Sequence, residues 1–157
     1  MAARAVQRLR VLLPGLWLGL LLTVALVATP APFAMLAPAD AGRVVARVLA
    51  QEAYASLAFG VVLLLLERRA ARDAAEQGQG SQFSAGIVMA LGALFCTVAG
   101  YFALQPMMTQ ARSGQGALSF AQLHAVSAAF YLVKAGLVAA LAWRAAGLPV
   151  VSRPPSS

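Results

Sequence analysis

The sequence predicts an all-α integral membrane protein, a single bundle of four transmembrane helices with both termini in the cytoplasm. The chain is 61% hydrophobic and 11% charged, with a mean hydropathy of +0.79, whereas soluble domains are about half apolar and about a quarter charged. The apolar residues collect in four blocks, and about 20 such residues span the hydrocarbon core of a bilayer. Arginines gather at the ends of the blocks, as the positive-inside rule expects.

The first two blocks predict helices over about residues 11–36 and 44–66. Pro14 suits the first turn of the first helix, where a missing N–H matters little, while Pro30 and Pro32 should end or kink it. A cleaved signal peptide is the alternative for this block. Its apolar run is longer than the usual core of about 7–15 residues, which favours a retained helix.

The last two blocks predict helices over about residues 84–104, closed by Pro106, and 120–143. Together the four helices form one domain over residues 1–145. Residues 146–157 are rich in proline and serine and are expected to form a disordered tail. None of the blocks alternates in polarity as a membrane β-strand would.

Charge sets the expected orientation and excludes one class of partner. The net charge is +7, but the arginines do not share a face with interleaved aromatic residues, so no nucleic-acid partner is expected. Eight arginines lie on one side of the predicted membrane, Arg4, Arg8, Arg10, Arg68, Arg69, Arg72, Arg144 and Arg153, and three on the other, Arg43, Arg47 and Arg112. This asymmetry predicts a multi-pass protein of the plasma membrane, the inner membrane of a bacterium, with both ends inside.

The fourth helix carries a polar stripe inside the predicted membrane. His124, Ser127, Tyr131 and Lys134 fall within an arc of about 80° at 100° per residue. His124 and Lys134 are the only histidine and the only lysine in the chain. Side chains of this kind are rare in lipid and normally face other helices.

The second helix offers partners for this stripe in Arg47, Gln51 and Glu52. If its outer end lies near residue 43, Glu52 is level with His124 and too far from Lys134 for a direct pair. We therefore expect a contact between Glu52 and His124 near the outer leaflet. The candidate polar cluster comprises Arg47, Gln51, Glu52, His124, Ser127, Tyr131 and Lys134.

These residues also have structural explanations. Arg47 and Lys134 can extend toward the headgroups on either side of the membrane, and His124 can be a hydrogen-bonded structural residue. One histidine and one cysteine, Cys96, cannot form the usual metal-binding motifs. No cofactor is predicted and no catalytic constellation is present, so the sequence does not favour an enzyme. Haem or copper held by His124 is the alternative.

Small residues recur every four positions along the helices, for example at Gly15 and Gly19 in the first and at Gly92, Cys96 and Gly100 in the third. Such spacing lets helix backbones approach closely in lipid. It predicts a tight bundle embedded in the lipid bilayer, with a face available for a second copy or another membrane protein.

Two motifs resemble a known family. Pro32 and Phe33 end the first block, and "SFAQLHAVS", which includes Ser119 and His124, opens the last. Over residues 11–144 the chain resembles the transmembrane-protein-205-like domain family, whose bacterial members are small four-helix membrane proteins of unknown function. The resemblance implies topology and no chemistry.

The sequence therefore predicts a small multi-pass membrane protein of unknown biochemical function with an intramembrane polar pocket. The first alternative is a haem- or copper-associated membrane protein that uses His124. The second is a small transporter or accessory subunit in which Glu52 and Lys134 handle protons or ions.

Overall fold

Four long helical segments make up the computed structural model, which describes residues 2–78 and 83–147. The first two segments comprise α1 Ala2–Thr23, the π-helix η1 Val24–Ala28, α2 Pro30–Met35 and the single helix α3 Pro38–Glu76. The last two comprise α4 Ala85–Thr97, the π-helix η2 Val98–Ala103, α5 Leu104–Arg112 and α6 Phe120–Ala146. All four segments are long and apolar enough to cross a membrane, and the described residues contain no strand. The predicted all-α bundle of four such helices is confirmed.

The helices extend beyond the apolar blocks that predicted them. The first begins at Ala2 and not near residue 11, which places Pro14 inside α1 and not in its first turn. The second begins at Pro38 and runs to Glu76, because the Glu-, Arg- and Ala-rich sequence after its apolar block favours helix as strongly as the block itself. The predicted tail began at residue 146, but α6 includes Ala146, and residues 148–157 of the tail lie outside the described residues.

Each π-helical turn precedes a proline. Proline removes one helical hydrogen bond, and its ring clashes with the carbonyl four residues earlier. For Pro30 that carbonyl lies in η1, and for Pro106 it lies in η2. The wider π turns re-route the hydrogen bonds at these points, and α2 and α5 then begin with the prolines in their first turns. Pro106 therefore does not close the third segment, which continues to Arg112.

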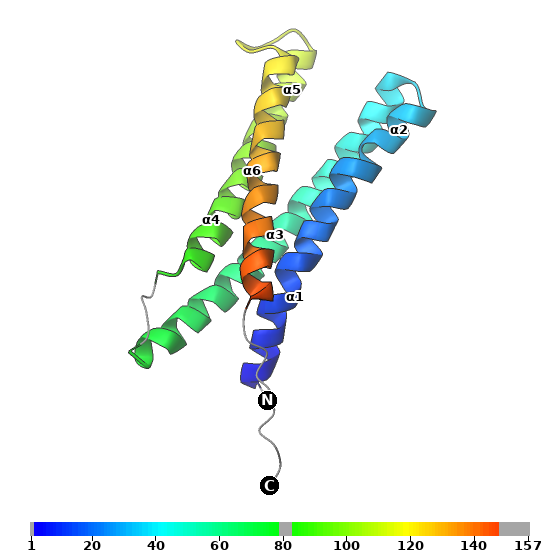
Figure 1. Cartoon of the computed structure of the whole chain (residues 1–157). Coiled ribbons are helices and arrows are strands. Elements are labelled where there is room, and N and C mark those ends of the chain that lie inside the picture. The colour runs from blue at the N-terminus through cyan, green and yellow to red at the C-terminus, as the bar shows by residue number, and fades with distance from the viewer. Residues whose placement is uncertain (1, 79–82, 148–157) are drawn as a thin grey trace.

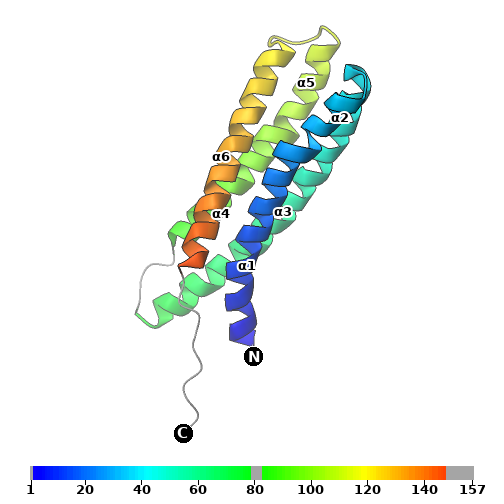
Figure 2. The same cartoon turned by 45° about the vertical axis from the view of Figure 1, so that its right-hand side comes forward.

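The segments pack as an antiparallel bundle. α6 packs against both α1 and α4, and α3 packs against the same two helices. Figure 1 shows that the bundle opens toward the end that holds α2 and α5, and Figure 2 shows the start of α1 and the end of α6 together at the other end. The fully buried centre consists of Trp17, Leu21, Leu63, Ala93 and Val138.

Two of the predicted small residues allow close helix contact, and two do not. A Cβ atom on Gly92 would lie 2.9 Å from Leu137 Cδ1, and one on Gly100 would lie 2.6 Å from Phe130 Cβ. α4 and η2 thus approach α6 closely through these glycines, as expected in lipid. A Cβ on Gly15 or Gly19 would meet nothing within 4 Å, and both glycines are exposed on α1.

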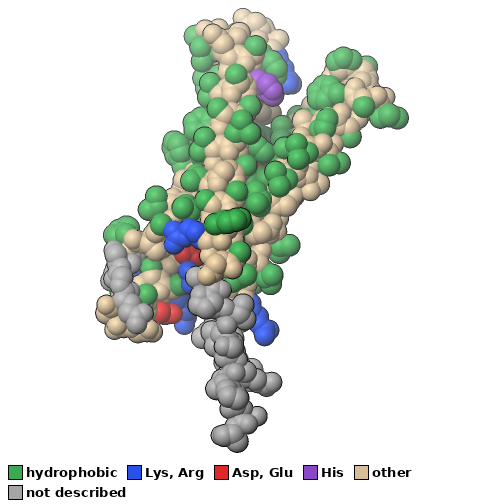
Figure 3. Space-filling view, in the orientation of Figure 1, with side chains coloured by type: hydrophobic (Ala, Val, Ile, Leu, Met, Phe, Trp, Pro, Cys, Tyr) green, Lys and Arg blue, Asp and Glu red, His purple; other side chains and the backbone are tan. Residues whose placement is uncertain are grey.

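Charged and apolar side chains occupy different parts of the surface. Figure 3 shows hydrophobic side chains over the length of the visible face, while most of the visible Lys, Arg, Asp and Glu side chains lie toward the end where α1 begins. The exposed apolar residues, such as Leu12, Leu65 and Leu132, cover the faces that a bilayer would contact. This distribution suits helices that cross lipid and end in a basic interface.

Candidate functional site

A lysine and a glutamate form a buried ion pair inside the bundle. Lys134 Nζ of α6 lies 2.8 Å from Glu52 Oε1 of α3. Their side chains are only 4% and 3% exposed. Removing two charges from water is unfavourable, and the attraction between them compensates only when further hydrogen bonds satisfy the remaining polar atoms.

Ser56 and Trp17 supply those hydrogen bonds. Ser56 lies one turn after Glu52 on α3, and its hydroxyl donates to Glu52 Oε1. Ser56 Oγ accepts a hydrogen bond from Trp17 Nε1 at 2.9 Å and another from Lys134 Nζ at 3.5 Å. The hydroxyl therefore uses its one proton and both lone pairs. Through it α1, α3 and α6 meet at one buried oxygen atom.

Tyr131 completes the surroundings of the lysine. Lys134 Nζ lies 4.6 Å from the centre of the Tyr131 ring, a distance at which a cation is attracted to an aromatic face. The Tyr131 hydroxyl donates to the backbone oxygen of Leu21 at 2.8 Å. This bond fixes α6 against α1 beside the ion pair.

The expected separation of Glu52 from Lys134 is wrong, and the reason is where α3 begins. The helix starts at Pro38, several residues before the outer end assumed from the apolar block. Glu52 then lies about 21 Å along α3 from Pro38, and Lys134 lies about 21 Å along α6 from Phe120. The two side chains are therefore level, and Glu52 pairs with Lys134.

His124 lies apart from this pair. It is exposed on α6, and its ring stacks on Phe120 with centroids 5.8 Å apart and planes 13° apart. The guanidinium carbon of Arg112 lies 4.5 Å from the centre of the same Phe120 ring. Among the residues that the structure describes, no hydrogen bond or ion pair joins His124 to Glu52, so the expected contact between them is wrong.

The remaining members of the predicted cluster also separate. Ser127 Oγ donates to the backbone oxygen of Gly100 at 2.7 Å and so ties α6 to η2. Arg47 and Gln51 are exposed on α3. Of the seven candidates, the structure brings Glu52, Tyr131 and Lys134 together.

Sequence reasoning missed Ser56 and Trp17. Residues four apart on a helix are neighbours, so the spacing of Glu52 and Ser56 was a signal that the hydroxyl could bond the carboxylate. A buried tryptophan usually finds an acceptor for its N–H, which made Trp17 a candidate in an otherwise apolar block. No pattern in the sequence predicted that the Ser56 hydroxyl would bond both Glu52 and Trp17.

A family model described as a domain of unknown function (DUF4149) matches residues 12–117. The chain belongs to the DUF4149 family. No curated protein and no solved structure matches it. The matched part includes Trp17, Glu52 and Ser56 and ends before α6, so Lys134 and Tyr131 lie outside it.

The DUF4149 chain has a second ion pair nearer the end where α1 begins. Arg10 Nε lies 2.8 Å from Glu67 Oε1, and a second guanidinium nitrogen lies 3.1 Å from Glu67 Oε2. The side chains are 19% and 10% exposed. This bidentate ion pair holds α1 against α3 with defined geometry.

Gly86 makes room for this second pair. A Cβ on Gly86 would lie 2.1 Å from Glu67 Oε2 and 2.7 Å from Glu67 Cδ. We expect Gly86→Ala to displace Glu67 from Arg10 and to lower the free energy of unfolding by about 1–3 kcal/mol, the usual effect of overpacking. Denaturation of the purified protein in mixed micelles, followed by circular dichroism, measures it.

Gly42→Ala is the matched control, because Gly42 is also helical and a Cβ there would meet nothing within 4 Å. That change should leave stability unaltered or raise it by up to about 1 kcal/mol, since alanine favours helix over glycine. Equal destabilisation by both substitutions would contradict the role assigned to Gly86.

His124 is the candidate ligand for a haem or a copper ion. The described residues contain no group of three or more His, Cys, Asp or Glu side chains that could hold a metal ion. His124 is the residue that would hold a haem or a copper ion, and its exposed ring stacks on Phe120.

Proposed function

We propose that the chain is a multi-pass membrane protein whose Glu52–Lys134 pair binds and releases a proton, acting as a small transporter or as an accessory subunit of one. The observation that carries this is the 2.8 Å contact between two side chains that are both less than 5% exposed. Ionisable residues inside membrane proteins are rare, and they mark ion pathways and proton relays.

The depth of the pair supports the proposal. α6 is about 40 Å long at 1.5 Å per residue, and Lys134 lies roughly halfway along it. The hydrocarbon core of a bilayer is about 30 Å thick, so the pair lies far from either interface. A proton exchanged there changes the charge of the bundle where an unbalanced charge is most unfavourable, and this couples protonation to helix packing.

The hydrogen bonds around the pair allow more than one protonation state. When Glu52 takes a proton, its carboxyl group can donate to Ser56 Oγ in place of Lys134 Nζ, and the serine hydroxyl can then turn to another acceptor. Three other titratable side chains interact electrostatically with the pair, Cys96 of α4, Tyr101 of η2 and Tyr131 of α6. All four packed segments thus surround the proposed site.

Infrared difference spectroscopy of the protein in lipid vesicles tests the proposal. Lowering the pH should produce a carbonyl band from protonated carboxyl groups, and Glu52→Gln should remove one component of that band. Glu67→Gln is the control, because Glu67 is also a poorly exposed glutamate in an ion pair. Persistence of the whole band in Glu52→Gln, or its absence from the unaltered protein, would refute proton exchange at Glu52.

Orientation and assembly are further parts of this proposal. The basic end of the bundle, where α1 begins and α6 ends, faces the cytoplasm of a bacterium across its inner membrane, on the positive-inside rule. The exposed glycines Gly15 and Gly19 support self-association through α1 or contact with another membrane protein. The likeness to the transmembrane-protein-205-like family also belongs to this proposal. Its most specific motif, around Ser119 and His124, lies outside residues 12–117, so the family match does not include it.

A further inference from the structure

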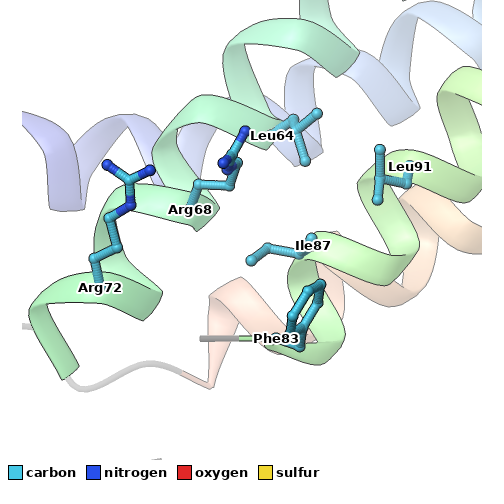
Figure 4. A pocket seen from close by; sticks show the side chains of 6 residues that line it. All are labelled: Leu64, Arg68, Arg72, Phe83, Ile87 and Leu91. Atoms are coloured by element: carbon cyan, nitrogen blue, oxygen red, sulfur yellow. The ribbon is translucent and has the colours of Figure 1, made fainter. Parts of the chain in front are cut away.

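A surface hollow lies between α3 and α4 near the basic end of the bundle. Its volume is about 280 Å³. Figure 4 shows that α3 forms one wall and that α4, with the residue before its cap, forms the other. The lining residues are Leu64, Arg68, Arg72, Phe83, Ile87 and Leu91.

The α3 wall carries two arginines without a carboxylate partner. Arg68 and Arg72 are one turn apart, both are exposed, and no ion pair joins either to another described residue. Of the nearby acids, Glu67 binds Arg10, Asp73 lines a separate hollow, and Glu76, one turn after Arg72, does not line this one. The lining therefore has positive charge and no negative charge.

The rest of the lining is apolar and is arranged by depth. Leu64 precedes Arg68 by one turn on α3, so the three positions Leu64, Arg68 and Arg72 share one face. On the opposite wall Leu91 lies one turn further from the basic end than Ile87. One end of the hollow is thus charged and lies beyond the apolar block of α3, while the other end is apolar and lies within it.

We propose that this hollow binds an anionic glycerophospholipid. Its phosphate lies between Arg68 and Arg72, and the first part of an acyl chain lies along Leu64 and Leu91. Guanidinium groups match phosphate oxygens in geometry and charge, and basic pockets between transmembrane helices select anionic headgroups. A soluble phosphate would use the arginines alone, whereas the apolar end of the same hollow fits the chain of a lipid.

Native mass spectrometry of the full chain in mild detergent measures this binding. With phosphatidylglycerol and phosphatidylcholine of identical chains, we expect bound phosphatidylglycerol to predominate. The double variant Arg68→Gln/Arg72→Gln should weaken phosphatidylglycerol binding roughly 30-fold, on the contribution of a basic residue near an anionic surface. Phosphatidylcholine binding should weaken less, because its choline cation offsets the attraction of the arginines for its phosphate.

The control Arg43→Gln/Arg112→Gln removes the same charge at the opposite end of the bundle and should leave the preference intact. An equal loss in this control would show attraction by net charge and would overturn the site. Displacement of the lipid by inorganic phosphate would assign the hollow to a soluble anion and would also overturn the proposal. All four arginines are exposed, so without lipid the thermal midpoints should stay close to that of the unaltered protein, with a small decrease in the control from loss of the exposed Arg43–Asp40 pair. The result is independent of proton exchange at Glu52.

Discussion

Replacing either member of the buried pair alone should strongly destabilise the bundle. Glu52→Gln leaves the Lys134 charge without its counter-ion, and Lys134→Met leaves the Glu52 charge in the same state. Removing one partner of a buried pair typically lowers the free energy of unfolding by about 3–5 kcal/mol. Unfolding of each variant by sodium dodecyl sulfate in mixed micelles, followed by circular dichroism, gives the change.

The double variant Glu52→Gln/Lys134→Met shows how much of the instability of the single variants comes from an unbalanced charge. It should recover most of the lost stability, because no unbalanced charge then remains in the bundle. Asp40→Asn is the control for charge removal, since Asp40 pairs with Arg43 in an exposed position and such pairs contribute at most about 1 kcal/mol. A double variant as unstable as the sum of the single variants would contradict this account. If the double variant folds yet lacks the component of the carboxyl band assigned to Glu52, stability and proton exchange are separate properties of the same pair.

Truncating Trp17 should have an effect of similar size. Trp17 is fully buried, stacks on Phe59 with centroids 6.0 Å apart, and donates to Ser56. Trp17→Ala removes the packing and the hydrogen bond together, and such truncations cost about 3–5 kcal/mol. The same micelle unfolding measurement applies, with helix content as the signal.

Trp143→Ala is the matched control, because Trp143 is 84% exposed. The free energy of unfolding of this variant should be within about 0.5 kcal/mol of that of the unaltered protein. Trp17→Phe keeps most of the packing and removes the N–H. The stability of Trp17→Phe should lie between those of Trp17→Ala and Trp143→Ala. We expect a loss of about 1–3 kcal/mol, because the hydrogen bond is lost and its acceptor is left without this donor. If Trp17→Ala were no worse than Trp143→Ala, the centre of the bundle would not depend on α1.

The number and type of the helices could be predicted because lipid leaves few alternatives. A long apolar block must satisfy its backbone hydrogen bonds internally, and a helix does so at any sequence of sufficient hydropathy. The ends of the helices were harder to predict, since the Arg- and Ala-rich sequence before Glu76 is helical without being apolar. The continuation through Pro106 depends on η2, a local change of hydrogen bonding that hydropathy does not report.

The candidate site could be predicted only in part. The shared face of Tyr131 and Lys134 follows from helix periodicity, and the depth of Glu52 made a partner necessary. Which partner it has depends on where α3 begins, and a shift of a few residues changed the expected partner from His124 to Lys134. The contact of Trp17 depends on how α1 is rotated about its axis, which a single sequence does not encode in any local pattern.

The ion pair also constrains how the protein is made. Glu52 and Lys134 are 82 residues apart in the chain. At about 5–20 residues per second, the ribosome synthesises Lys134 roughly 4–16 s after Glu52. During that interval the nascent chain contains Glu52 without its basic partner. Membrane insertion of α6 is therefore the step that balances the charge of Glu52, and α6 completes an interior that α1, α3 and α4 form without it.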